Sequence, residues 1–240
     1  MKDLARAFLK RQKTFSSCFI SSPEALSLIA MAGFRNRDSQ VEREISFFLD
    51  EKFYPGIGAK TVRHHDVETQ MQGIDISLTY KDLHDASVDE KAISHYINKN
   101  IPTFAFELSF LNKGQVIEGW FSDENKKTEY YLLIWIWANK DWNITKDDIT
   151  KLELFLVPRQ KISEYLTQQG FNSERLREKA EQIRDKNIEG AIDKSYGKDF
   201  YFFLSNSLVE APVNVVIRKS ILAELAYEKF IFESNTAGLS

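Results

Sequence analysis

The sequence contains a single cysteine, Cys18, among its 240 residues. One cysteine cannot form a disulfide within the chain, and it excludes a zinc site built from several cysteines. We therefore expect the protein in a reducing cytoplasm. Long hydrophobic runs are also missing. The most apolar one, residues 130–138, is far shorter than the roughly 20 residues that cross a bilayer, so we expect no membrane partner.

An excess of positive charge is absent as well. The formal net charge is -3 and the isoelectric point is about 5.9, which excludes a histone-like protein coated with basic residues. A local basic cleft on an acidic body remains compatible with these values. Hydrophobic residues make up 43% of the chain and aromatic residues 13%, which is enough for a substantial core.

Hydrophobic periodicity predicts an α/β chain. Helices are expected over most of residues 1–54, with starts near Asp3, Ser22 and Asp38, and over 92–100, 159–168, 173–188 and 220–232. Strands are expected over 73–80, 86–91, 102–110, 116–121, 130–138, 152–157, 200–204 and 213–218. The predicted architecture is one domain over 1–240 with a mixed central β-sheet flanked by helices. Its core covers about 38–140, with N-terminal helices before it and an α/β extension after it.

One acidic tripeptide of the form [DE]-x-K stands out by its context. The pattern occurs three times, at residues 50–52, 89–91 and 124–126, which is about as often as the composition predicts by chance. Only the copy at 89–91 lies on a predicted strand that can pair with a neighbouring acidic strand. We therefore select Asp89, Glu90 and Lys91 for further argument.

The strand pattern places three charged groups at one point. Residues two apart on a strand face the same side, so Asp89 and Lys91 project together while Glu90 points away. A hairpin between residues 73–80 and 86–91 brings Asp75 beside Asp89. Two adjacent carboxylates repel each other unless a cation lies between them. Mg²⁺ is such a cation, with Mn²⁺ as an alternative, and it activates water and polarises phosphodiesters. A nearby lysine stabilises charge on the transferring phosphate.

The segment Gln70-Met-Gln-Gly-Ile-Asp75, followed by Val88-Asp-Glu-Lys91, resembles the core of the PD-(D/E)XK nucleases, the restriction-endonuclease-like superfamily. The resemblance implies an acidic residue and a D/E-x-K on adjacent strands of a mixed sheet between helices. It also implies that Asp75 and Asp89 bind the metal and that Lys91 assists the attacking water. The proline of the family name is absent, because Gly-Ile precedes Asp75 here.

Three further residues are candidates for the same site, each with an ordinary alternative. Glu44 lies on the preceding helix, where many superfamily members carry an auxiliary catalytic acid, and a solvated glutamate explains it equally well. Gln70 is a candidate for contact with substrate phosphate or is a turn residue. Glu107 interrupts the apolar strand 102–110, where a carboxylate is costly unless it is paired. We expect Glu107 at the metal site or at an edge of the sheet.

The basic loop Lys126-Lys127-Thr128 is the expected contact with nucleic acid, because lysines and a hydroxyl suit phosphate oxygens. A solvated loop is its ordinary alternative. The leading prediction is a Mg²⁺-dependent endonuclease acting on DNA, of a restriction or phage-associated kind. The oligomeric state is open, and a homodimer would suit a double-strand cut, which often uses two active sites. One alternative is a catalytically silent nuclease fold that binds nucleic acid or protein. The other is an interaction protein whose resemblance is accidental.

Overall fold

The computed structural model describes residues 40–187, 189–192 and 199–234. The chain divides into two compact units, residues 1–43 and 44–240. The helices expected to start near Asp3 and Ser22 lie outside the described residues. The single domain over 1–240 therefore stays a prediction, and the fold below is that of the second unit.

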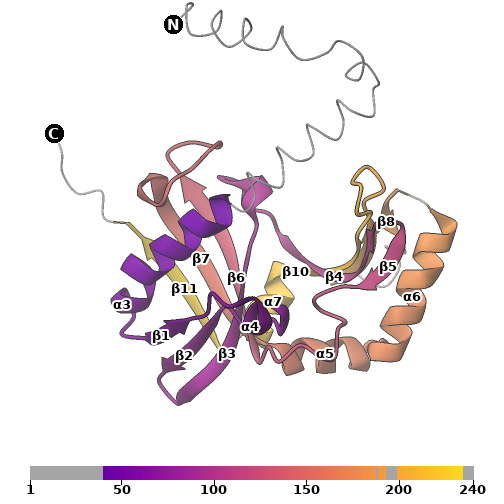
Figure 1. The fold of residues 1–240 in the computed structure, drawn as a ribbon, viewed down its shortest axis with the longest axis horizontal. Helices are drawn as coiled ribbons and strands as arrows, with labels where there is room; N and C mark the ends of the chain where they lie inside the picture. Colours follow the sequence, from indigo (N-terminus) through magenta and orange to yellow (C-terminus); the bar gives the residue numbers. More distant parts are fainter. Residues whose placement is uncertain (1–39, 188, 193–198, 235–240) are drawn as a thin grey trace, which may run out of the picture. The chain divides into compact units, whose positions relative to one another are not determined.

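A six-stranded sheet forms one layer of this unit (Figure 1). Its strands, in spatial order, are β1 (Lys60–Arg63), β2 (Ile76–Tyr80), β3 (Leu83–Ala92), β6 (Tyr130–Ala138), β7 (Ile149–Pro158) and β11 (Glu228–Glu233). β3 and β6 are parallel and every other neighbouring pair is antiparallel, so the sheet is mixed. β6 is central and buried along nearly its whole length, as its continuous apolar run predicted.

A helical segment covers one face of this sheet (Figure 1). It runs through residues 44–48, a π-helical turn η2 (Leu49–Phe53) and a last turn α3 (Tyr54–Gly56). The rings of Phe48 and Phe53 lie edge-on to Phe232 of β11, with centroids 5.8 and 5.9 Å apart. The apolar stripe of this helix, predicted from its 3.6-residue period, is thus buried against the edge strand of the sheet.

The second sheet has five antiparallel strands and belongs to the same hydrophobic core as the opposite face of the first. Its spatial order is β5 (Gln115–Glu118), β4 (Thr103–Asn112), β10 (Val213–Arg218), β9 (Phe200–Leu204) and β8 (Gly190–Ile192). The helices α5 (Arg159–Gln168), α6 (Ser173–Lys186) and α7 (Lys219–Leu225) add buried side chains to this core, and the short α4 (Val67–Met71) lies between β1 and β2 in the chain. The fold class is α/β, with one mixed and one antiparallel sheet flanked by helices.

Four details of the predicted fold are wrong. The single sheet is two sheets. Residues 92–100 form no helix, because β3 continues to Ala92 and only a 3-10 turn follows (η3, Ser94–Tyr96). The closing helix over 220–232 stops at Leu225, and β11 follows it, since alternate residues Phe230 and Phe232 pack inward on a sheet edge. The strand at 116–121 stops at Glu118, and a turn follows it.

β3 is anchored by a buried ion-pair network on the face that the helical segment covers. The Glu90 carboxylate, whose side chain is 7% exposed, accepts two hydrogen bonds from the Arg63 guanidinium, at 2.8 and 2.9 Å. It also accepts one from the Tyr54 hydroxyl at 2.7 Å. Arg63 binds Asp50 with its remaining donors, at 2.6 and 2.8 Å. The network ties the helix, β1 and β3 together through Glu90.

We expect Arg63→Met to lower the free energy of unfolding by about 3–5 kcal/mol, because it leaves the Glu90 carboxylate buried without its cation. The control is Arg177→Met, which removes exposed ion pairs with Glu118 and Glu124 and should cost under about 1 kcal/mol. Urea unfolding measures both values. Equal losses in the two variants would show that Glu90 does not depend on Arg63.

Candidate active site

Asp75 and Asp89 meet on the face of the sheet opposite Glu90. The backbone N–H of Asp75 donates to the Val88 carbonyl at 2.9 Å, which continues the β2–β3 ladder by one residue and sets Asp75 beside Asp89. The Oδ2 of Asp75 accepts a hydrogen bond from the backbone N–H of Glu90 at 2.8 Å. The expected hairpin geometry is confirmed, and Glu90 lies on the other face of the sheet, where its carboxylate is buried.

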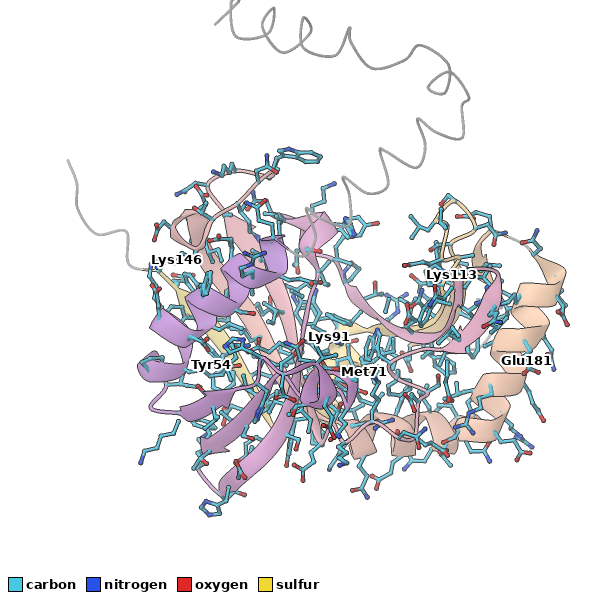
Figure 2. The ribbon with its side chains drawn as sticks, viewed as in Figure 1. Tyr54, Met71, Lys91, Lys113, Lys146 and Glu181 are labelled. Carbon is cyan, nitrogen blue, oxygen red and sulfur yellow. The ribbon has the colours of Figure 1, made fainter. Side chains whose placement is uncertain are left out.

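Lys91 completes the group of three. Its Nζ lies 2.7 Å from Oδ1 of Asp89 and 5.2 Å from the centre of the Trp120 ring. Asp89 is only 3% exposed, whereas the Lys91 side chain is 29% exposed. The ammonium therefore has access to solvent while it neutralises a buried carboxylate. Figure 2 labels Lys91 on the side of the sheet away from Tyr54.

The electrostatics of Asp89 follow from this burial. Desolvation, reinforced by the adjacent Asp75 carboxylate, raises the pKa of Asp89 to about 7, although Lys91 opposes the shift. Burial also raises the pKa of Glu107. The backbone N–H of Trp120, which donates a hydrogen bond to this carboxylate, and the Lys91 charge partly oppose the rise. Glu107 on β4 therefore lies in the electrostatic neighbourhood of Lys91, and its role as a metal ligand stays a prediction.

The turn before Asp75 is held by the loop expected to bind nucleic acid. Gly73 has φ +74°, in the left-handed region. The Thr128 hydroxyl donates to the Gly73 carbonyl at 2.6 Å, and the Lys126 ammonium donates to the Met71 carbonyl at 2.5 Å. Thr128 is 5% exposed, so its hydroxyl supports the turn and is not a surface contact for phosphate.

Gln70 and Lys127 lie beside the same turn. The Gln70 side-chain amide donates to the His64 carbonyl at 3.3 Å, on an exposed surface. The backbone N–H of Lys127 donates to the Gln72 carbonyl at 2.8 Å, and Lys127 is exposed. Their contact with a nucleic acid stays a prediction. Both residues border the turn that carries Asp75.

Glu44 does not belong to this group. Its carboxylate accepts a hydrogen bond from the backbone N–H of Lys146 at 2.8 Å, in η4 (Lys146–Asp148) beyond the end of β6. Glu44 belongs to the helical segment, whose Ser46 hydroxyl donates to the Glu90 carboxylate at 3.4 Å, so it lies on the Glu90 side of the sheet, whereas Asp89 faces the other side. Lys146 and Lys91 are well separated in Figure 2. The expected auxiliary acid is therefore a loop-anchoring residue.

Comparisons of the chain with models of protein families, with curated proteins and with solved structures found no match. Across the described ranges 40–187, 189–192 and 199–234, no cluster of three or more His, Cys, Asp or Glu side chains is placed to hold a metal. No helix in that part of the chain has the length and apolarity to cross a membrane. The functional argument rests on the geometry of the site.

The structure adds residues for which the sequence contains no signal. Arg63 holds the strand that carries the site, although β1 was not predicted as a strand at all. Tyr131 lies next to Asp89 across the β3–β6 pairing, but the sequence shows only one more aromatic residue in an apolar run. The register between strands that are far apart in the sequence determines the positions of Arg63 and Tyr131, and a local sequence pattern does not encode that register.

We expect Gly73→Ala to destabilise the protein more than Gly114→Ala does. Both glycines have positive φ, but a Cβ at Gly73 would lie 2.5 Å from the Thr128 hydroxyl oxygen, while one at Gly114 meets nothing within 4 Å. The steric conflict should cost about 1–3 kcal/mol beyond the backbone strain that the two share. Urea unfolding of both variants tests this, and matching losses would contradict the close approach of Thr128.

We expect Asp89→Asn to change how stability depends on pH. Because the folded protein raises the pKa of Asp89 from 3.8 to about 7, this group favours the folded state most at low pH. That contribution is lost as pH rises from about 4 through 7. Without divalent cations, the free energy of unfolding of Asp89→Asn at pH 8 should therefore exceed that of the wild type by more than about 1 kcal/mol. At pH 4 the two proteins should differ little. Urea unfolding at a series of pH values measures this difference. The same dependence of the free energy of unfolding on pH in both proteins would refute the prediction.

Proposed function

We propose that this protein is a metal-dependent nuclease that hydrolyses phosphodiester bonds of DNA. The observation that carries the proposal is the convergence of Asp75, Asp89 and Lys91 on one face of two adjacent strands. This arrangement supports the resemblance to the restriction-endonuclease-like core, which requires an acid and a D/E-x-K on adjacent strands of a mixed sheet. The same convergence distinguishes residues 89–91 from the two other tripeptides of that form.

The donor set fits a hard divalent cation. Asp75 and Asp89 offer carboxylate oxygens, and the Asp75 carboxylate is close enough to raise the pKa of Asp89. Mg²⁺ or Mn²⁺ prefers such ligands together with water and phosphate oxygens. A bound cation would polarise the phosphodiester and offset the charge that develops on the leaving oxygen. Asp89 must release its proton to bind a cation, so affinity should rise with pH around neutrality.

The remaining steps fall to the chain's own residues. The backbone N–H of Glu90 fixes one oxygen of Asp75 and so orients this carboxylate, as outer hydrogen bonds to metal ligands commonly do. Lys91 is paired with Asp89 and partly exposed. Its ammonium can therefore turn to an approaching phosphate when the Asp89 carboxylate binds a cation instead. In a site with little water, such a cation stabilises the transition state strongly.

The test is cleavage of supercoiled plasmid and of single-stranded DNA with Mg²⁺ or Mn²⁺. We expect Lys91→Ala and Asp75→Ala to lower the cleavage rate by a factor on the order of 100 or more. The matched control is Lys52→Ala, which removes the lysine of the tripeptide at residues 50–52 on the helical segment and should leave the rate unchanged.

Each result has a distinct reading. Cleavage that survives both Lys91→Ala and Asp75→Ala removes the site assignment. DNA binding by the wild type without cleavage favours the silent nuclease fold. A wild type that neither binds nor cleaves DNA favours an interaction protein whose resemblance is accidental. The choice of DNA over RNA, the homodimer and the cytoplasmic location remain predictions.

A further inference from the structure

Tyr131 carries a buried hydroxyl group that the free protein leaves unused. The residue is 0% exposed, and its hydroxyl oxygen has no hydrogen-bond partner among the residues that the structure describes. Buried polar groups in folded proteins are nearly always hydrogen-bonded, so an exception calls for an explanation. In the parallel pairing of β3 with β6, Tyr131 is the direct partner of Asp89, and paired residues face the same side of a sheet.

Packing explains the ring of Tyr131 but not its hydroxyl. The ring lies edge-on to Trp120 and Phe106, with centroids 5.1 and 6.1 Å apart, and it also contacts Phe121 at 6.3 Å. Phenylalanine would fill this aromatic cluster equally well and would bury no polar atom. The hydroxyl therefore needs a reason outside the packing of the core.

The charged surroundings of the hydroxyl indicate what it can bind. Burial raises the pKa of Tyr131, and the Asp89 carboxylate raises it further while Arg159 lowers it, so the hydroxyl is protonated at neutral pH and acts as a donor. Arg159 has no acceptor atom, and its guanidinium donates to the backbone carbonyls of Lys126, Phe121 and Asp123. Asp89 is the charged neighbour that can accept a hydrogen bond.

We propose that Tyr131 is a positioning residue that donates its hydroxyl hydrogen to the Asp89 carboxylate when Lys91 turns from Asp89 to the substrate phosphate. The inference rests on the proposed nuclease function. In the free protein, Lys91 occupies Oδ1 of Asp89 at 2.7 Å. When the ammonium leaves, the carboxylate loses its closest donor, and Tyr131 is placed to replace it from the neighbouring strand. Asp89 then keeps its orientation through the catalytic cycle.

The experiment uses Tyr131→Phe with Tyr130→Phe as the matched control. Tyr130 is the preceding residue of β6, so its side chain points to the opposite face of the sheet. We expect Tyr131→Phe to keep or raise the Tm of the metal-free protein, because the lost hydroxyl had no partner. With a non-cleavable DNA bound, it should weaken Mn²⁺ binding, measured by calorimetry, about tenfold or more. The kcat for DNA should fall by a similar factor while KM changes little.

The outcomes separate this inference from the proposed function. A wild type that binds Mn²⁺ and cleaves DNA, with Tyr131→Phe equal to it in Mn²⁺ affinity and kcat, would overturn the role of Tyr131 and leave the nuclease intact. A large fall in Tm for Tyr131→Phe would overturn it too, since the hydroxyl would then have a partner in the free protein. A wild type that neither binds Mn²⁺ nor cleaves DNA would overturn both. The same losses in Tyr130→Phe would show that the effect is not specific to this face.

Discussion

Strand β3 buries the carboxylates of two consecutive residues on opposite faces of one sheet, and much of the structure serves to compensate them. Glu90 faces the helical segment and is neutralised by Arg63, with Tyr54 as a further donor. Asp89 faces the second sheet and is paired with Lys91. An uncompensated buried charge costs several kcal/mol, so the fold depends on β1 and the helix staying in register with β3.

The two compensations differ in a way that suits structure on one face and chemistry on the other. Glu90 receives a two-pronged guanidinium contact and a tyrosine hydroxyl, which oppose the rise in its pKa that burial causes. Asp89 has a single ammonium and a neighbouring carboxylate, and its pKa is raised to about 7. A buried carboxylate with only one cationic partner favours a bound cation, and a perturbed pKa of this kind is a common mark of functional sites. Stability on one face of the strand thus supports an energetically costly group on the other.

The approach to the site is fixed by segments that lie far apart in the sequence. The turn at Gly73 and the loop at Lys126 and Thr128 hold each other through hydrogen bonds between side chains and backbone. The loop is therefore part of the scaffold that places Asp75. The tight approach of Thr128 also accounts for glycine at residue 73, where both the positive φ and the lack of space exclude a side chain.

The sequence by itself determined the local elements and the core of the site. Strand periodicity placed Asp75, Asp89 and Lys91 on one face and Glu90 on the other, because alternation along a strand is a local rule. Only the tertiary structure decided which distant residues join them. In it, Glu44 lies away from the site, Thr128 hydrogen-bonds the turn at Gly73, the strands form two sheets, and Tyr131 pairs with Asp89. These outcomes depend on the register between strands that are far apart in the chain, which a local pattern does not encode.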